Sequence, residues 1–171
     1  MYINCHSYHS LRYGTIPVTD LVEEAQRCGV SALALTDINT VTGIYEFYST
    51  CQSAGIKPLV GMEVRRGDKL LYIALATDQR GIQEICTLLT LHHCEGLALE
   101  DQAPEFAHLR IIYPWENYPP SFRAGEYLGV RPAEIPNLIR PERRALLQHM
   151  VVLAPVTFRT PTEHQLHRIL R

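Results

Sequence analysis

Several features of membrane proteins and of common enzyme families are absent from the 171-residue sequence. No apolar run approaches the roughly 20 residues of a membrane-spanning helix. The first residues lack a basic segment followed by an apolar core, so nothing favours export. A Gly-rich phosphate loop, a GxSxG motif and an HExxH motif are also missing. We therefore expect a cytoplasmic protein without membrane contacts, and neither a P-loop enzyme nor an HExxH zinc protease.

Closely spaced cysteine pairs of the CxxC type are absent. The five cysteines stand at positions 5, 28, 51, 86 and 94. An odd number without that spacing argues against a disulfide framework or a structural zinc site, and favours reduced thiols. Cys28, Cys51 and Cys86 fall on apolar faces of predicted helices, where we expect them to be buried as small apolar side chains.

An excess of positive charge is absent as well. Sixteen Lys and Arg stand against eighteen Asp and Glu, a net charge of −2, which excludes a histone-like polyanion binder. The C-terminal part is nevertheless locally basic. Its Arg140, Arg143, Arg144 and Arg168 are candidates for a nucleic-acid contact. A solvent-exposed helix face, or a contact between domains, explains the same residues.

Apolar spacing is the strongest signal that is present, and 46% hydrophobic residues are enough for one domain with its own core. Seven strands are predicted, at residues 2–5, 32–35, 59–64, 70–76, 109–113, 127–130 and 150–153. Helices are predicted after the N-caps Thr19 and Asp78 and between Val41 and Gly55. Residues 91–107 are interpreted as a surface excursion. Alternating strands and helices predict an α/β fold, either a β/α barrel or a doubly wound sheet.

The end of the sequence predicts one more helix. Residues 160–163, Thr-Pro-Thr-Glu, form a capping-box pattern with proline at the first helical position. The apolar Leu166, Ile169 and Leu170 follow at helical spacing, and no C-cap signal precedes Arg171. We expect residues 160–171 to begin a helix that leads into the remainder of a longer chain.

Three predicted strand ends carry side chains that bind metals. His6 follows the first strand, Asp37 follows the second, and Glu63 closes the third. One imidazole and two carboxylates at one sheet edge are suitable ligands for a divalent ion. Polar loop residues at strand ends are common, however, so the spacing alone leaves both explanations open. Ser7 beside His6 does not form a catalytic triad, because sequence neighbours rarely face each other.

Two further clusters have simpler explanations than a site. Residues 92–94, His-His-Cys, lie near the end of a predicted helix, where histidine complements the helix dipole. Residues 113–120 are rich in aromatic residues and proline. They could stack on single-stranded nucleic acid, but a rigid loop with Trp115 packed inward is the favoured interpretation.

Three segments, residues 4–11, 32–37 and 55–64, resemble the PHP (polymerase and histidinol phosphatase) domain family. The amino-acid sequence of these segments is most similar to the PHP domain at the N-terminus of bacterial DNA polymerase III alpha subunits. This resemblance covers residues 1 to about 90 strongly and the remainder in register. It implies a distorted seven-stranded β/α barrel over residues 1–159, in a single domain. Active members of the family bind up to three metals and hydrolyse phosphate esters.

Residue by residue, the resemblance also implies that much of the metal site is lost. His6, Asp37 and Glu63 are kept. Family ligand positions correspond here to Asn4, Ile38, Leu71, Trp115, Val156 and Phe158. A centre of two or three metals needs several imidazoles and bridging carboxylates, so we expect at most one weakly bound Mn, Zn or Mg ion. We expect no catalytic residue in this domain.

The resemblance implies a domain that supports a replicative polymerase or docks a partner. Its partners would be the remaining polymerase domains, a proofreading exonuclease subunit or other replisome proteins, with DNA bound through the parent protein. The alternative is a metal-dependent phosphoesterase that uses His6, Asp37 and Glu63, with His9 as acid or base.

Overall fold

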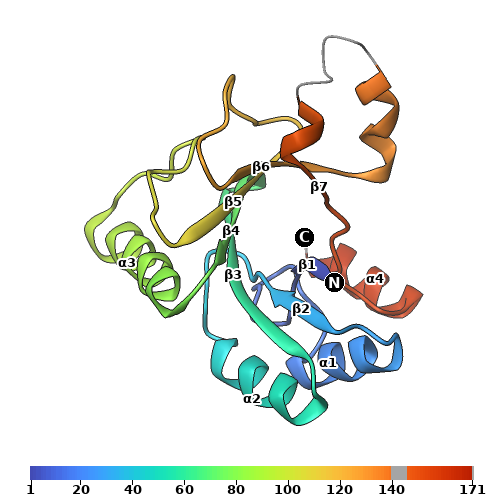
Figure 1. Ribbon diagram of the computed structural model, residues 1–171. Coiled ribbons are helices and arrows are strands. Elements are labelled where there is room, and N and C mark those ends of the chain that lie inside the picture. Colours follow the sequence, from blue (N-terminus) through green and yellow to red (C-terminus); the bar gives the residue numbers. More distant parts are fainter. Residues whose placement is uncertain (140–145, 171) are drawn as a thin grey trace. The chain divides into compact units, whose positions relative to one another are not determined.

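The computed structural model describes residues 1–139 and 146–170, and Figure 1 shows its elements. In chain order these are β1 (Tyr2–Cys5), α1 (Val18–Arg27), β2 (Ala32–Leu35), α2 (Ile44–Ala54), β3 (Lys57–Arg66), β4 (Lys69–Ala76), α3 (Gln79–Glu95), β5 (Leu109–Pro114), β6 (Glu126–Val130), the 3-10 helix η1 (Pro132–Ile139), β7 (Met150–Val152) and α4 (Pro161–Leu170). The strands lie in the order β1 to β7. The predicted α/β class and the seven predicted strands are confirmed, each strand end within two residues of its prediction.

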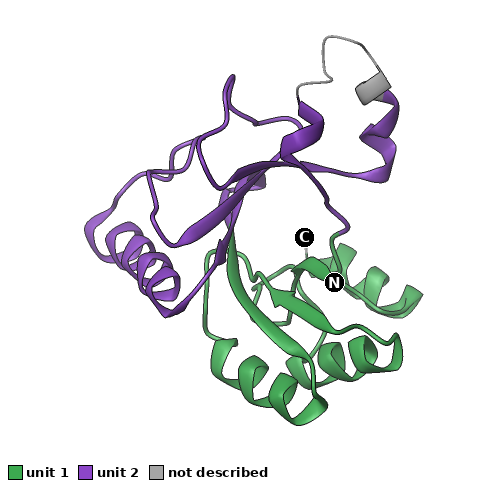
Figure 2. Cartoon of the chain, in the orientation of Figure 1, with its two compact units in different colours: residues 1–63, 155–171 green, residues 64–154 purple. Residues whose placement is uncertain are grey.

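The chain divides into two compact units, which Figure 2 shows in green and purple. Unit 1 comprises residues 1–63 and 155–171. In it β1 pairs with β2 and β2 with β3, all parallel. The apolar faces of these strands and of helices α1 and α2 form one core, made of Cys5, Ile16, Val18, Leu21, Val22, Ala25, Leu33, Leu35, Phe47, Cys51 and Ile56. Burial of these side chains stabilises unit 1.

Unit 2 comprises residues 64–154. A two-residue turn at Gly67 and Asp68 separates β3 from β4. Strand β4 is antiparallel to β5, whereas β5, β6 and β7 are parallel. Helix α3 packs on β4. The buried apolar residues of this unit include Leu71, Tyr72, Ile73, Ile85, Leu88, Leu109, Ile111, Ile112, Tyr113 and Leu128.

The predicted N-terminal caps of two helices, α3 and α4, are confirmed. The Asp78 carboxylate accepts hydrogen bonds from the N–H groups of Arg80 and Gly81, at 2.8 and 3.1 Å, and so caps α3. At α4 the Thr160 hydroxyl accepts a hydrogen bond from the Glu163 N–H at 3.1 Å. These N–H groups lie in first turns and have no partner within their own helices, which is why a side-chain acceptor nearby stabilises the helix.

Other local predictions are wrong. Thr19 is not an N-cap, because α1 begins at Val18 and its preceding residue, Pro17, offers no side-chain acceptor. The excursion predicted for residues 91–107 begins later than expected, since α3 continues to Glu95. Inside that excursion Leu99 is buried.

Two of the three cysteines expected to be buried are exposed. Cys51 is buried, but Cys28 and Cys86 are exposed. Cys28 lies one residue beyond the end of α1, where the helical face no longer determines which way a side chain points. No helix among the described residues is long and apolar enough to cross a membrane.

We expect the two buried cysteines to be alkylated much more slowly than the three exposed ones. Burial raises the pKa of Cys51 to about 11, and burial together with the Asp37 charge raises the pKa of Cys5 to about 12. The thiolate is the reactive form, so a neutral alkylating agent at pH 8 should modify Cys28, Cys86 and Cys94 in the folded chain. Mass spectrometry should find all five modified only in denaturant. Rapid native modification of Cys5 would contradict this burial.

Candidate functional site

The three side chains predicted as metal ligands lie in unit 1. His6 follows β1, Asp37 follows β2, and Glu63 lies in β3. Because these strands are parallel, their carboxyl ends meet at one edge. Backbone bonds hold that edge together, since the Thr36 N–H donates to the Cys5 carbonyl at 2.9 Å and the Glu63 N–H donates to the Asp37 carbonyl at 3.1 Å.

His6 and Glu63 belong to one hydrogen-bonded group, the His6 group, with Asn4 and Thr157. His6 is fully buried and Glu63 is 2% exposed. His6 Nε2 lies 2.9 Å from Glu63 Oε2, and the Asn4 side-chain amide donates to the same oxygen at 2.8 Å. His6 Nδ1 lies 3.1 Å from Thr157 Oγ1. A carboxylate only accepts hydrogen bonds, so His6 Nε2 carries a proton, and in the neutral ring Nδ1 accepts from the Thr157 hydroxyl.

Thr157 is the member of this group that the sequence did not indicate. The positions carried over from the family are its neighbours Val156 and Phe158. The Val156 backbone exchanges hydrogen bonds with β1, because the His6 N–H donates to its carbonyl at 2.8 Å and its own N–H donates to the Asn4 carbonyl at 2.9 Å. Phe158 is 41% exposed. Only this long-range pairing brings Thr157 to His6; no local pattern identifies it.

Asp37 forms a separate group, the Asp37 group, with Ser7 and Ser10. Its Oδ1 accepts hydrogen bonds from the Ser7 N–H at 2.7 Å and the Ser10 hydroxyl at 2.6 Å, and its Oδ2 accepts from the Ser7 hydroxyl at 2.7 Å. The Ser10 hydroxyl in turn accepts from the Ile38 N–H at 3.1 Å. Asp37 is 2% exposed. These donors offset the cost of burying its charge.

A tight loop between β1 and α1 presents both serines to Asp37. The Gly14 N–H donates to the Ser10 carbonyl at 2.8 Å, and the Ser10 N–H donates to the Ser7 carbonyl at 3.0 Å. A Cβ at Gly14 would lie 1.7 Å from that Ser7 carbonyl oxygen. Only glycine permits this approach, so Gly14 is required for the loop that surrounds Asp37.

Three of the carboxylate oxygens in these groups already accept hydrogen bonds within the protein. Glu63 Oε2 accepts from two side chains, and both oxygens of Asp37 accept from the serines. Asn4 Oδ1 is buried without a hydrogen-bond partner. Among the residues that the structure describes, His, Cys, Asp and Glu side chains form no group of three that could hold a metal. A cation bound at Glu63 Oε2 or at Asp37 would have to compete with these hydrogen bonds.

The side chain of His9, expected as an acid or base in the alternative, lies in neither group, although the His9 N–H donates to the Ser7 hydroxyl at 3.2 Å. Its Nε2 is 3.8 Å from Glu46 Oε2, which is too long for a hydrogen bond. The Tyr8 hydroxyl donates to the same oxygen at 3.3 Å. The His9 ring packs closely on Gly43, where a Cβ would lie 2.7 Å from the His9 Cδ2. The His9 ring therefore faces helix α2.

The remaining predicted site residues lie elsewhere. Leu71 and Trp115, two positions carried over from the family, belong to unit 2. Trp115 is partly buried, and its ring centroid lies 5.7 Å from that of Tyr118. Arg168 is exposed in the last turn of α4. The other three basic candidates, Arg140, Arg143 and Arg144, lie outside the described residues.

The comparisons with known proteins agree on one family. The PHP domain matches residues 3–119. DNA polymerase III subunit alpha of Halalkalibacterium halodurans is 35% identical over 101 residues, which is 55% of this chain and 9% of that protein. The error-prone DNA polymerase of Symbiobacterium thermophilum is 29% identical over 192 residues, which cover all of this chain and 17% of that protein. The chain thus spans less than a fifth of these relatives.

Two solved structures align with about half of the chain. An amidohydrolase from Chromobacterium violaceum, with bound sulfate and no metal, aligns with a TM-score of 0.44 and 25% identity. The alignment covers 52% of this chain and 31% of that one. A putative metal-dependent phosphoesterase from Bifidobacterium adolescentis aligns with a TM-score of 0.39 and 24% identity, over 50% of this chain and 32% of that one.

We expect Asp37→Ala to destabilise the domain. The substitution leaves the Ser7 N–H and the hydroxyls of Ser7 and Ser10 without their buried acceptor, and each such group costs about 1–3 kcal/mol. The free energy of unfolding in urea should therefore fall by about 3 kcal/mol. Glu100→Ala, a substitution of an exposed carboxylate, should change it by less than about 0.5 kcal/mol. Equal free energies of unfolding for the two variants would contradict a structural role for Asp37.

Proposed function

Because the chain belongs to the PHP domain family, we propose that it is the PHP domain of a DNA polymerase III alpha subunit and serves as a non-catalytic structural or partner-docking module. The assignment to an alpha subunit is supported by similarity to alpha subunits of several bacteria, among them Escherichia coli at 31% identity over 102 residues. In this proposal DNA-templated synthesis, a nucleotidyl transfer, belongs to other domains of the parent chain.

The His6 group is the observation that supports a non-catalytic role. A hydrolytic metal centre needs ligand lone pairs that face a common ion and a water that the ion activates. Here His6 donates to Glu63, and Asn4 donates to the same carboxylate oxygen. Both side chains thereby stabilise a buried negative charge without a cation. The chemistry left to these residues is to fix β1, β3 and the segment at Thr157 to one another.

The partners follow from the proposed parent protein. Residues 1–159 would be the PHP domain, and residues 160–171 would lead toward the other polymerase domains in the cytoplasm. A proofreading exonuclease subunit or another replisome protein is the proposed docking partner. The exposed Arg168 and the basic residues at 140, 143 and 144 are the proposed contact with DNA or with a neighbouring domain.

A metal-dependent phosphoesterase with His6, Asp37 and Glu63 as ligands is the competing function. Its strongest support is the position of the three residues at one edge of parallel strands. It requires the Asp37 group and the His6 group to rearrange around an ion. At most one weakly held Mn, Zn or Mg ion is compatible with so few ligands.

The test is the metal content of the purified 171-residue chain after incubation with Mn and Zn. We expect close to zero equivalents by elemental analysis, and a Tm that EDTA does not change, because a bound metal stabilises the folded state by mass action. His6→Ala should lower the free energy of unfolding by about 2–3 kcal/mol, since it leaves the buried Glu63 carboxylate with one donor fewer.

The matched control is His93→Ala, which removes an exposed imidazole near the end of α3. It should change neither stability nor metal content. Two or more metal equivalents in the wild type that are lost in His6→Ala, together with a Tm lowered by EDTA, would refute the non-catalytic role. They would support a phosphoesterase with more ligands than His6, Asp37 and Glu63. The membership in the PHP family would stand in either case.

A further inference from the structure

A groove of about 590 Å³ runs along helix α3 in unit 2. One wall is α3 itself, and the other is formed by Leu97 and residues 104–106, which follow α3 in the chain. The α3 residues that line it are Arg80, Gln83, Glu84, Thr87, Leu88 and Leu91. They recur at intervals of three and four, so they share one face of the helix. From Arg80 to Leu91 a helix rises about 16 Å, and the groove is therefore elongated.

Hydrogen bonds fix the second wall of the groove to α3. Glu84 accepts from the N–H groups of Ala107 and His108, both at 3.1 Å. His108 Nδ1 lies 2.8 Å from Asp78 Oδ2, and the His108 carbonyl accepts from the Thr77 N–H at 3.0 Å. The segment just before β5 is thus held beside α3 in the free protein, so a partner would not have to order it.

The apolar surface of the groove is accessible. Leu97 is 43% exposed, and Leu91 and Phe106 are only partly buried. Leu88, which is 5% exposed, is the most buried of the lining residues. The remaining lining residues of α3 are polar. Accessible apolar side chains with a polar rim are typical of an interaction site.

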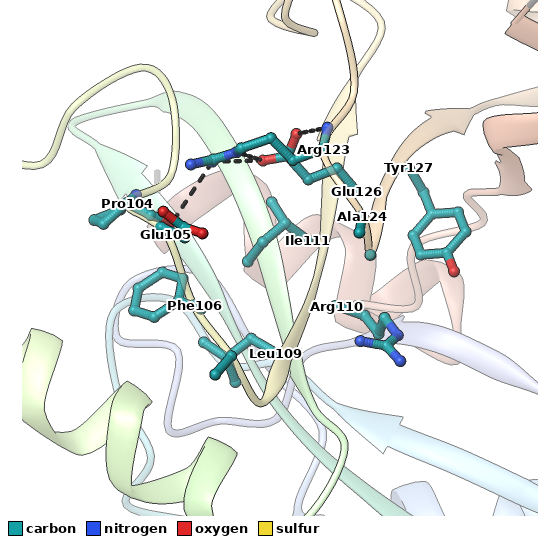
Figure 3. A pocket seen from close by; sticks show the side chains of 12 residues that line it. Pro104, Glu105, Phe106, Leu109, Arg110, Ile111, Arg123, Ala124, Glu126 and Tyr127 are labelled. Carbon is teal, nitrogen blue, oxygen red and sulfur yellow. Dashed lines mark hydrogen bonds and ion pairs between the residues drawn. The ribbon is translucent and has the colours of Figure 1, made fainter.

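The charge around the groove is mainly negative. Residues 81–109 contain five Asp and Glu, at positions 84, 95, 100, 101 and 105, and no Lys or Arg. Figure 3 shows Glu105 between Pro104 and Phe106, in residues that also line the neighbouring pocket drawn there. Glu95, four residues after Leu91, lies on the same face of α3 at the carboxyl end of the groove. Glu95 and Glu105 are exposed, and neither has an ion pair within the described residues.

We propose that this groove binds an amphipathic helix of a partner protein that carries Lys or Arg beside its apolar face. Apolar side chains at helical spacing pack on Leu91, Leu97 and Phe106. The basic side chains face Glu105 and Glu95, and this charge complementarity selects the partner. A helix of about three turns matches the length of the groove. The same carboxylates disfavour a nucleic acid, whose phosphates they would repel.

This inference gives the docking role proposed above a surface, and it rests on that proposal in assuming a protein partner. The two can fail separately. Metal binding with intact binding at the groove would refute the non-catalytic role and leave the groove as a docking site. A metal-free chain that binds nothing at the groove would refute this inference alone.

The test is calorimetric titration of the 171-residue chain with a synthetic helical peptide of about 14 residues, built from Leu, Lys and Ala with its leucines on one face. We expect one peptide per chain, with NMR shifts concentrated in α3 and residues 97–106. Added salt should weaken binding, because it screens exposed charges. The same peptide with Glu in place of each Lys should bind at least about tenfold more weakly, since Glu105 and Glu95 repel it.

Two variants of the chain test the two kinds of contact. Leu97→Glu should weaken binding of the Lys peptide at least about tenfold, because it removes an apolar contact. Its Tm should be unchanged, since Leu97 is 43% exposed; Leu166→Glu on α4, where the leucine is 47% exposed, is the matched control. Glu105→Lys should weaken binding at least about threefold and reduce its salt dependence. Its control is Glu23→Lys, at an exposed position of α1.

Three results would show that the proposal is wrong. The Lys peptide could fail to bind at millimolar concentration, the Glu peptide could bind as tightly, or Leu97→Glu and Leu166→Glu could bind the Lys peptide alike. Sedimentation of the chain without peptide tests a further occupant. Self-association that Leu97→Glu abolishes would assign the groove to a second copy of this chain and overturn the basic partner helix.

Discussion

The buried carboxylate of Glu63 is the constraint on which unit 1 depends. A charge that is 2% exposed costs several kcal/mol unless hydrogen bonds compensate it. Asn4 and His6 supply those bonds from β1, and Thr157 holds His6 from the far end of the sequence. Strands β1 and β3 and the segment after β7 are thereby tied to one carboxylate. Side-chain donors thus stabilise this buried charge in the described structure.

The buried charge of Asp37 is also compensated by hydrogen bonds, but from different donors. It lies at the neighbouring strand end, and the loop of Ser7 and Ser10 surrounds it with hydroxyl groups and an amide. Gly14 makes that loop tight enough to reach. The two carboxylates at this edge are thus satisfied separately, each by its own group. The donors to one carboxylate are therefore not shared with the other.

Unit 2 contains a third buried carboxylate, and it has a different consequence. Glu126 is paired with Arg123 and the Tyr113 hydroxyl, so the loop before β6 is held against β5. The charges of Arg123 and Glu126, drawn in Figure 3, therefore offset each other within the fold.

The sequence by itself determined the seven strands, the α/β class and the cap at Asp78, because apolar spacing and capping act over a few residues. It also placed His6, Asp37 and Glu63 at strand ends that share an edge. The tertiary structure decided how these groups are satisfied. Thr157 meets His6 across 151 positions of the chain, and no local pattern encodes that contact. The exposure of Cys28 was likewise decided by packing. Hydrogen bonds between distant segments depend on the whole fold, and this is why sequence spacing identified the candidate ligands but not their partners.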